Sequence, residues 1–369
     1  MAVASVTLRT PPPRRVLILL LGSIGDVVRA LPLLGRMRES WPAAHLAWAV
    51  EPKSEPILRS HPWLNELIVY DRTRAPWSFV PFLRRIRRGR FDVVIDLQRH
   101  LKSGITSLSS GAPERWGFAP ANVKEFNHWF SNRQITVQPR MRLKLEQYQV
   151  FGDALGLAST PLRFGLEPSP EVQARVARIL ADTPRPRLGV ILGSSWPSRL
   201  YFPESVAAVI RNLAAQPIGV PGFFPILIGG REELALALAV QRELRDLPVL
   251  DLTGKTRLED LAGIFAECDA ACGPDSGPMH IAAAVGCPVV SLWGATAALR
   301  SAPWGSAEFA LSAEIPCSPC YLRRCPIGGE CMRRIAPEDV AAMVRRASAE
   351  HAHTPRGFAL DSASIRQTR

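Results

Sequence analysis

Residues 273–294 read GPDSGPMHIAAAVGCPVVSLWG, and this stretch carries the clearest fold signal of the chain. An apolar run, DAACG, ends in a Pro-Asp-Ser-Gly-Pro turn, which leads through a small-residue helix to a second apolar run, PVVSLWG. A helix therefore starts at the carboxyl end of a strand, where unpaired N–H groups and the helix dipole favour an anion. The stretch predicts a nucleotide-diphosphate site. Its candidate residues are Asp275, Ser276, Gly277 and His280.

The rest of the chain alternates strands with helices in the same way. Buried-strand patterns occur at RVLILLL (15–21) and FDVVIDLQ (91–98), and the alternation restarts at RLGVILGSS (187–195) after a Pro-rich stretch. Short apolar runs between helices are typical of parallel sheets, whose ligands gather at the carboxyl ends of the strands. We therefore expect an α/β fold with ligand-binding loops at one edge of each sheet.

The length of 369 residues exceeds what one hydrophobic core usually supports, so two domains are expected. The pattern predicts a disordered leader over residues 1–14 and an N-terminal domain over 15–170. A C-terminal domain follows over 171–337, and a final helix with a polar tail over 338–369. The N-terminus lacks the apolar core of a signal peptide, and no apolar run approaches the ~20 residues that span a bilayer, which predicts a cytoplasmic protein.

The net charge of +12 predicts attraction to polyanions. The charge concentrates in the stretch that contains Arg84, Arg85, Arg87, Arg88, Arg90, Arg99 and Lys102. A solvated basic helix face would explain this pattern equally well. Because no aromatic-rich nucleic-acid motif accompanies the cluster, we expect an anionic membrane face or an anionic acceptor and no nucleic acid.

Seven cysteines in a cytoplasmic chain predict reduced thiols. Cys268, Cys272 and Cys287 fall in apolar segments and are interpreted as small core residues. The other four, Cys317, Cys320, Cys325 and Cys331, share one Pro- and Gly-rich loop. A structural zinc is one interpretation. The second pair has the wrong spacing for common zinc sites, so we expect a thiol-rich loop and no required cofactor.

The loop GSIGD (22–26) directly follows the first predicted strand. It does not match the G-x-G-x-x-G pattern, which disfavours a nicotinamide enzyme. Asp26 lies at the tip of the strand, where its carboxylate could act as a general base. Capping of the following helix is the alternative role.

The corresponding loop of the second half is GSSWPSR (193–199). Ser194 and Ser195 offer hydroxyl groups and Arg199 a fixed cation, which together with the 277–280 helix start would neutralise a diphosphate leaving group without a metal. Glu232, which follows the strand FFPILIGG (223–230), could accept hydrogen bonds from ribose hydroxyls, or could be an exposed residue in the first turn of a helix.

Several motifs in this order resemble glycosyltransferase family 9, the heptosyltransferases of lipopolysaccharide core assembly, over residues 15–345. The matching stretches are GDVVRALP (25–32), VIDLQRHLKS (94–103), GAPERWGF (111–118), GSSWPSR (193–199), LTGKTRLEDLA (252–262) and residues 273–294. The resemblance implies the GT-B fold: two Rossmann-like domains facing a central cleft, with the last helix returning toward the N-terminal domain. It also implies inverting transfer of heptose from ADP-L-glycero-D-manno-heptose to the inner core (Kdo/heptose) of lipopolysaccharide.

By this resemblance Asp26 is the base that deprotonates the acceptor hydroxyl. Arg199 stands where relatives have Lys against the phosphates, and Thr256 lies near the adenine pocket. The resemblance also assigns acceptor binding to basic positions of the N-terminal domain: Arg99, Lys102 and Lys124. Because Asp275 would repel a phosphate, we assign it to the sugar hydroxyls or to fixing the turn.

The chain also departs from the family pattern, since Arg29 stands where many relatives have His or Thr. This departure leaves another nucleotide sugar or acceptor open. A nucleotide-sugar epimerase and a non-catalytic binding protein are the rival functions. The expected partners are ADP-heptose, an anionic lipid-linked saccharide and the cytoplasmic face of the inner membrane, which the protein meets as a monomer.

Overall fold

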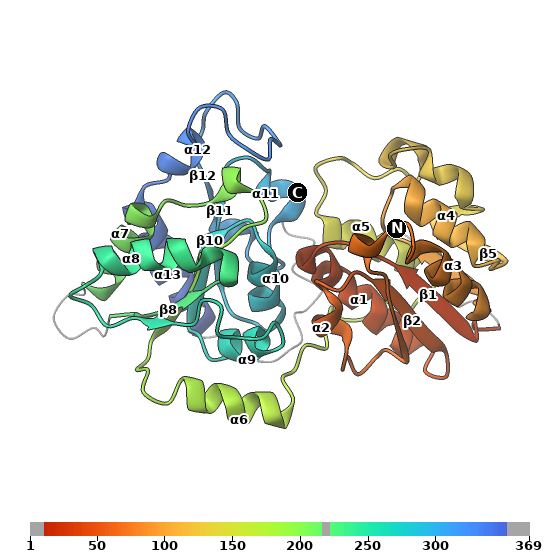
Figure 1. The fold of residues 1–369 in the computed structure, drawn as a ribbon, viewed down its shortest axis with the longest axis horizontal. Coiled ribbons are helices and arrows are strands. Elements are labelled where there is room, and N and C mark those ends of the chain that lie inside the picture. The colour runs from red at the N-terminus through yellow and green to blue at the C-terminus, as the bar shows by residue number, and fades with distance from the viewer. Residues whose placement is uncertain (1–10, 216–221, 353–369) are drawn as a thin grey trace, which may run out of the picture. The chain divides into compact units, whose positions relative to one another are not determined.

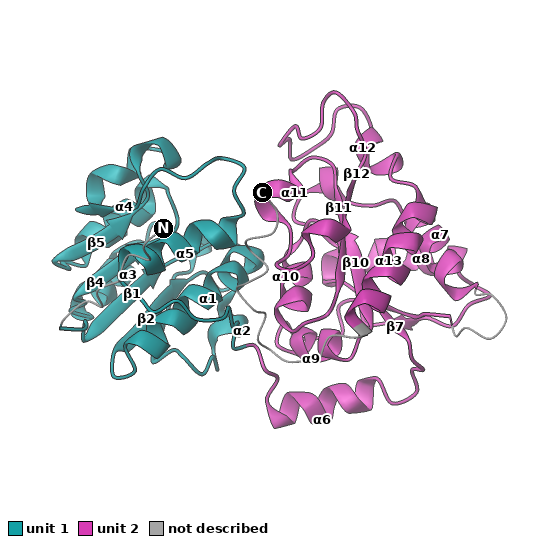
Figure 2. Cartoon of the chain, turned by 180° about the vertical axis from the view of Figure 1, so that it is seen from behind, with its two compact units in different colours: residues 1–165, 359–369 teal, residues 166–358 magenta. Residues whose placement is uncertain are grey.

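A computed structural model describes residues 11–215 and 222–352, and its chain divides into two compact units (Figures 1 and 2). Unit 1 extends to Gly165 and unit 2 starts at Leu166. The sequence predicts the domain boundary after residue 170, a few residues beyond the division between the two units, and this boundary stays a prediction. Most of the leader predicted over 1–14 and the tail beyond 352 lie outside the described residues.

Unit 1 is built on a six-stranded parallel sheet of order β3-β2-β1-β4-β5-β6. Its strands are β1 (Arg15–Leu19), β2 (His45–Val50), β3 (Glu66–Val69), β4 (Val93–Asp96), β5 (Glu114–Gly117) and β6 (Arg133–Gln134). Its α-helices are α1 (Ile24–Ser40), α2 (Glu55–Leu58), α3 (Phe79–Arg88), α4 (Leu101–Ser109) and α5 (Lys144–Ala154). The short 3₁₀ helices are η1 (Arg72–Arg74), η2 (Pro120–Asn122) and η3 (Asn127–Phe130).

Unit 2 repeats this arrangement, with a second six-stranded parallel sheet of order β12-β11-β10-β7-β8-β9. Its strands are β7 (Arg187–Ile191), β8 (Phe224–Ile228), β9 (Leu250–Asp251), β10 (Ala270–Pro274), β11 (Val289–Trp293) and β12 (Ala310–Ser312). Its α-helices are α6 (Pro170–Ile179), α7 (Pro203–Ala214), α8 (Leu234–Glu243), α9 (Asp260–Ala266), α10 (Gly277–Ala284), α11 (Ala298–Ser301), α12 (Glu330–Arg333) and α13 (Pro337–Ala352). Its 3₁₀ helices are η4 (Pro197–Arg199), η5 (Arg231–Glu233) and η6 (Ala307–Phe309).

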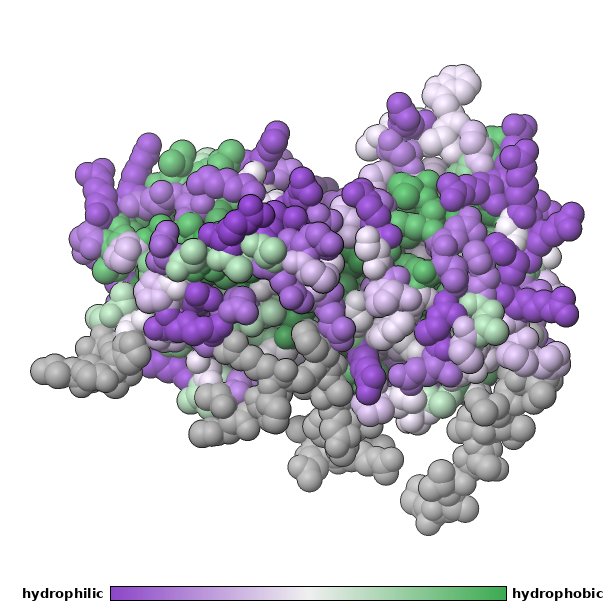
Figure 3. All heavy atoms as spheres, turned by 90° about the horizontal axis from the view of Figure 1, so that it is seen from below, coloured by the Kyte–Doolittle hydropathy of each residue, from purple (hydrophilic) through white to green (hydrophobic). Residues whose placement is uncertain are grey.

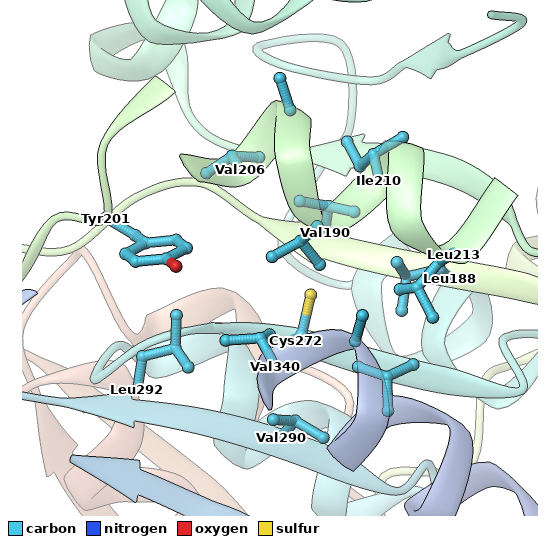
Figure 4. Close-up of a cluster of buried hydrophobic side chains, with 14 of the residues drawn as sticks. Leu188, Val190, Tyr201, Val206, Ile210, Leu213, Cys272, Val290, Leu292 and Val340 are labelled. Carbon is cyan, nitrogen blue, oxygen red and sulfur yellow. The ribbon is translucent and has the colours of Figure 1, made fainter. Parts of the chain in front are cut away.

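The core of unit 2 explains why its central strands are almost entirely apolar. β7, β10 and β11 present Leu188, Val190, Cys272 and Val290 to α7 and α13, and these side chains are buried (Figure 4). Cys268 and Cys287 are buried as well, so all three cysteines predicted to be core residues are confirmed. Burial raises the pKa of the Cys268 and Cys272 thiols to about 12, which keeps them protonated.

The last helix, α13, packs against α7, β10 and β11 within unit 2. The predicted return of this helix toward the N-terminal domain stays a prediction. Hydrophilic side chains cover most of the face in Figure 3, with smaller hydrophobic patches between them. Among residues 11–215 and 222–352, no helix combines the length and the apolar content needed to cross a membrane.

The chain order of the strands creates the same special position in each unit. β1 lies between β2 and β4, and β7 lies between β8 and β10, so strand order reverses beside the first strand of each sheet. At such a switch point the loops after the two central strands diverge to opposite faces of the sheet and leave room for a ligand. The loops after β1 and β4, and after β7 and β10, are therefore the expected place for a functional site.

Residues 273–294 form the end of β10, the following turn, α10 and β11. The close packing of β10 on β7 requires a glycine at position 273, because a Cβ there would lie 2.4 Å from the carbonyl oxygen of Ile191 on β7. A side chain there would separate β10 from β7 at the switch point of unit 2.

Candidate active site

Asp26 lies in the first turn of α1, directly after β1, at the switch point of unit 1. One carboxylate oxygen accepts hydrogen bonds from the Arg29 guanidinium and the Lys144 ammonium, both at 2.8 Å. The other oxygen accepts a hydrogen bond of 3.1 Å from the Ser23 hydroxyl. About a fifth of the side chain remains exposed, with 22% of its surface accessible. Asp26 is therefore an ordered carboxylate that solvent or a ligand can reach.

The charges around Asp26 decide its protonation state. Burial by itself opposes ionisation, but Lys144 and Arg29 outweigh this effect and hold the pKa of the carboxyl well below its usual range. Asp26 is consequently ionised at neutral pH. Such a carboxylate is able to accept a proton, and it becomes a stronger base when either cation moves away.

The basic residues predicted to bind the acceptor lie at the carboxyl end of β4. Arg99 follows this strand, and its backbone carbonyl accepts a hydrogen bond of 2.9 Å from the N–H of Lys124, whose side chain is exposed. The Lys102 ammonium, in the first turn of α4, lies 5.6 Å from the ring centroid of Tyr70 and 6.0 Å from that of Phe79. The three residues thus lie close to the carboxyl end of β4 in the backbone, but the Lys102 ammonium lies near Tyr70 while the Arg99 guanidinium lies over the Phe118 ring. Their contact with an acceptor stays a prediction.

Helix α5 supplies two site residues that sequence reasoning missed. Lys144 pairs with Asp26, and Gln147 accepts a hydrogen bond from the Arg99 guanidinium. These residues are three positions apart, so they share one face of the helix. Because 118 residues separate Lys144 from Asp26, no local sequence signal could have linked them. The helix joins the candidate base to the candidate acceptor-binding cations.

Four of the other basic residues of the cluster lie on α3, and Arg90 follows two residues after the end of this helix. This helix buries Phe82 and Ile86 and exposes Arg84, Arg85, Arg87 and Arg88. The solvated basic face, which the sequence left open as an alternative, is therefore present. Its attraction to an anionic surface stays a prediction.

In unit 2 the turn between β10 and α10 is tied to the neighbouring loops. One carboxylate oxygen of Asp275 accepts a hydrogen bond of 2.7 Å from the Thr296 hydroxyl and lies 3.1 Å from a guanidinium nitrogen of Arg199. The Ser194 hydroxyl donates a hydrogen bond of 2.7 Å to the backbone carbonyl of Asp275. These contacts favour the second of the two roles proposed for Asp275, which is to fix the turn.

Arg199 is the main cation beside this turn. It ends η4, its guanidinium carbon lies 4.0 Å from the ring centroid of Trp196, and 15% of its side chain is accessible. Stacking and pairing restrict the guanidinium to one orientation, so it costs little reorganisation to present a positive charge to a bound anion. Its pairing with Asp275 offsets part of that charge before any ligand arrives.

The start of α10 carries the remaining residues of the predicted anion site. Ser276 precedes the first helical residue, Gly277, and the Ser276 hydroxyl oxygen is buried with no hydrogen-bond partner among the described residues. His280 is buried in the first turn of the same helix. A buried hydroxyl at a helix N-terminus is placed to donate to an anion that also receives the helix N–H groups.

The other predicted donor-binding residues lie at the same edge of the sheet. Ser195 is exposed in the loop after β7, Glu232 is exposed in η5 after β8, and Thr256 is half-buried in the loop after β9. The neighbouring carboxylate, Glu233, accepts a hydrogen bond of 2.7 Å from the backbone N–H of Gly230 and so caps the helical turn. The roles of Ser195, Glu232 and Thr256 in binding a nucleotide stay predictions.

The four remaining cysteines, Cys317, Cys320, Cys325 and Cys331, line one small pocket in unit 2 together with Ser198 and Gly294. The backbone N–H of Gly329 donates to the sulfur of Cys325 at 3.2 Å. Within residues 11–215 and 222–352, no group of three or more cysteine, histidine or acidic side chains has an arrangement that could hold a metal ion. The four thiols lie together, as expected for a thiol-rich loop, and their arrangement adds no support for a zinc site.

Comparison with known proteins gives consistent matches. Residues 80–330 match the family model of glycosyltransferase family 9 (heptosyltransferase). The chain is 27% identical over 303 residues to the lipopolysaccharide core heptosyltransferase OpsX of Haemophilus influenzae, an alignment that covers 82% of this chain and 85% of OpsX.

Two solved structures share the fold. A glycosyl transferase family 9 protein from Veillonella parvula has a TM-score of 0.73 at 21% identity, with 91% of this chain and 97% of that chain covered. The E. coli heptosyltransferase WaaC with ADP-2-deoxy-2-fluoro heptose has a TM-score of 0.67 at 20% identity, with 90% and 99% covered. Together with the two parallel sheets, these likenesses confirm the predicted α/β fold of the GT-B type.

Proposed function

Since the chain belongs to glycosyltransferase family 9, we propose that it transfers a heptose from ADP-L-glycero-D-manno-heptose to the inner core of lipopolysaccharide. The observation that carries this proposal is the arrangement around the α10 turn, where Arg199, Ser276 and the helix start converge at the switch point of unit 2. The name of one relative, OpsX, describes a lipopolysaccharide core heptosyltransferase, which supports the proposal.

The proposed reaction is a single displacement with inversion. The acceptor hydroxyl gives its proton to the Asp26 carboxylate while its oxygen attacks the anomeric carbon of the heptose. The bond from that carbon to the diphosphate oxygen breaks, and ADP leaves with the bonding electrons. Arg199, the Ser276 hydroxyl and the N–H groups of α10 stabilise the charge that develops on the diphosphate.

The low pKa of Asp26 adds a condition to this mechanism. Proton transfer to a carboxylate held by two cations is unfavourable, so Asp26 must exchange at least one of them for the acceptor hydroxyl. Lys144 is the more mobile candidate because 24% of its side chain is accessible, against 8% for Arg29. An acceptor phosphate or carboxylate would attract the Lys144 ammonium and so strengthen the base as it binds.

The same proposal covers the partners that the sequence predicts. An anionic, lipid-linked saccharide is the acceptor, the protein acts at the cytoplasmic face of the inner membrane as a monomer, and the reaction requires no cofactor. The cations at Arg99, Lys102 and Lys124 and the basic face of α3 support an anionic acceptor.

The test is acceptor-dependent release of ADP. Purified protein is supplied with ADP-heptose in the presence and absence of lipopolysaccharide truncated before its first heptose, and UDP- and GDP-sugars serve as donor controls. We expect ADP release and an acceptor of increased mass only when both substrates are present. Conversion of ADP-heptose without acceptor would support the epimerase, and binding without turnover would support the non-catalytic protein.

A further inference from the structure

A 3₁₀ helix in unit 1 separates an inward-facing pair of side chains from an outward-facing pair. Side chains three residues apart lie on the same side of a 3₁₀ helix. In η3 the inward pair is Asn127 and Phe130. Asn127 is fully buried and its amide donates hydrogen bonds to Asp96 at 2.8 Å and to the carbonyl of His100 at 2.9 Å. These bonds anchor η3 to the carboxyl end of β4.

The second inward residue, Phe130, packs closely on α4. A Cβ added to Gly104 of α4 would lie 2.5 Å from the Phe130 ring, so the contact needs a glycine. Both inward residues thus hold η3 against the unit, Asn127 through its amide N–H groups and Phe130 through its ring, and they fix the orientation of the helix.

The outward pair is Phe126 and Trp129. Their rings stack with centroids 4.7 Å apart and an interplanar angle of 20°, yet Phe126 is 61% exposed and Trp129 is 70% exposed. Phe126 also has a left-handed backbone, with φ of 57°, which is unfavourable for a bulky residue. The chain therefore accepts local strain and still leaves two large aromatic rings in water, an arrangement that points to a partner.

The surroundings of this pair are apolar and cationic. Leu101 and Leu108, seven residues apart on α4, share one face of that helix and are 41% and 51% exposed. Lys124 is exposed two residues before Phe126. The intervening acid, Glu125, accepts a hydrogen bond of 3.1 Å from the N–H of Leu101 and lies 3.5 Å from a ring nitrogen of His100. We call Leu101, Leu108, Phe126 and Trp129 the aromatic rim.

We propose that the aromatic rim inserts into the interface of an anionic lipid bilayer. Exposed rings of Trp and Phe close to an exposed lysine, here Lys124, are typical of surfaces that bind the headgroup region of membranes, where apolar area and attraction to anionic lipids act together. The inference rests on the proposed function, because a lipid-linked acceptor is presented at such a surface. The new element is that named apolar side chains, next to the exposed Lys124, make the membrane contact.

Vesicle binding gives the first test. Co-sedimentation is measured with vesicles of phosphatidylglycerol and phosphatidylethanolamine and with vesicles of phosphatidylcholine. The variant is Phe126→Ser/Trp129→Ser, and the matched control is Leu238→Ser, which removes a side chain that is 55% exposed on α8 of unit 2. We expect the double variant to lose roughly tenfold or more in partitioning onto anionic vesicles, since two interfacial rings are removed, and the control to keep wild-type binding. Unchanged partitioning of the double variant would overturn the proposal.

Turnover gives the second test, which distinguishes contact of the aromatic rim with the membrane from contact with the saccharide. The same variants are assayed with truncated lipopolysaccharide embedded in vesicles and with the same saccharide after removal of its acyl chains. A membrane role predicts loss with the embedded acceptor and normal kinetics with the deacylated one. Equal loss with both acceptors would show that the rings contact the saccharide, which contradicts the proposal.

The vesicle test does not depend on the proposed function, whereas the turnover test does. If wild-type protein transfers no heptose, vesicle partitioning still decides whether the rim binds membranes. An unchanged thermal unfolding transition checks the folding of the double variant, and we expect it because both side chains project from the outward, exposed face of η3.

Discussion

The two units share one topology but carry opposite charge at the same position. In unit 1 the loop after the first strand leads to a carboxylate, Asp26, that two cations enclose. In unit 2 the corresponding loop leads to a cation, Arg199, that lies against one carboxylate, Asp275. Both arrangements lie where strand order reverses. The shared topology therefore places a charged side chain at the same point in each unit, and a few loop residues set the sign of its charge.

A second difference between the units is how their charged groups are neutralised. Arg199 and Asp275 are 15% and 11% accessible, whereas Lys144 and Asp26 are 24% and 22% accessible. The pair in unit 2 is the more enclosed and is also fixed by Thr296 and Trp196. We infer that unit 2 presents a rigid anion site, while unit 1 presents a carboxylate that can be released from its cations.

The largest expected effect comes from removing the charge at the switch point of unit 1. Asp26→Asn keeps the shape of the side chain but cannot accept the acceptor proton, so we expect transfer to fall about a thousandfold, within the range typical of general bases. ADP binding, measured by calorimetry, should persist because its predicted residues belong to unit 2.

The matched control for this prediction is Asp153→Asn, which removes an exposed carboxylate of unit 1 that pairs with Arg36. Its turnover should remain close to that of the wild type. Near-normal transfer by Asp26→Asn would remove Asp26 from the mechanism.

The next effect comes from unit 2. Arg199→Gln removes the fixed cation and leaves Asp275 without that partner, so the carboxylate would repel the donor diphosphate. We expect kcat/KM for the donor to fall about a hundredfold, as for loss of one charge-stabilising group. Arg199→Lys should recover most of it, because the charge is kept while the stacking on Trp196 is lost.

Arg211→Gln is the control for the donor kinetics, since this arginine forms an exposed pair with Asp246 elsewhere in unit 2. If Arg199→Gln leaves the donor kinetics as unchanged as this control does, the assignment of the α10 turn to the diphosphate is wrong.

A smaller effect distinguishes the stabilities of the two units. His61 of unit 1 is buried, with Nε2 2.9 Å from the carbonyl oxygen of Phe164. Burial lowers its pKa from 6.5 to about 4. Between these values the unfolded chain binds a proton that the folded chain does not, so stability falls as pH falls from 6.5 toward 4. At pH 5 the free energy of unfolding is lower by about 2 kcal/mol than at neutral pH.

Hydrogen exchange measures this loss separately in the two sheets. Amides of β1 should lose more protection than amides of β7 between pH 7 and pH 5, after correction for the intrinsic pH dependence of exchange. His61→Gln should remove the difference. Equal losses in both strands, unaffected by the substitution, would exclude His61 as the cause.

The smallest predicted effect is the coupling between Asp26 and Lys144. A double-mutant cycle of Asp26→Asn and Lys144→Met, read from the free energy of unfolding, should give about 1 kcal/mol, because the pair is partly exposed. A coupling near zero would mean that the two side chains do not interact in solution, and Lys144 would then have no effect on the base.

Sequence reasoning recovered the repeated α/β pattern because parallel strands buried on both faces are apolar throughout, as in RVLILLL and FDVVIDLQ. It missed β5, β6 and β12. β5 contains Glu and Arg, β6 is Arg133–Gln134 alone, and β12 is only three residues long, so none shows a buried-strand pattern. Strands at or near the edge of a sheet are short and polar, and their pairing comes from the neighbouring strand.

In the candidate site, too, some residues could be predicted from the sequence and others could not. The turn at 273–280 was readable because strand, turn and helix are contiguous in the chain, and the residues predicted there lie at one switch point. Lys144, Gln147 and Thr296 were not found, because each reaches its partner from a separate element. Asp275 was noticed as unsuited to a phosphate, but its partners Arg199 and Thr296 came only from the structure.

Which segments become buried strands, where a helix start follows a strand, and the excess of positive charge can all be read from the amino-acid sequence. These properties depend on local pattern and composition, which act over a few neighbouring residues. Three further properties come from the packing of the chain: two cations hold Asp26 ionised, Asp275 pairs with Arg199, and Phe126 and Trp129 face solvent. Each of these depends on which elements pack together, and that follows from burial of the whole sheet and its helices.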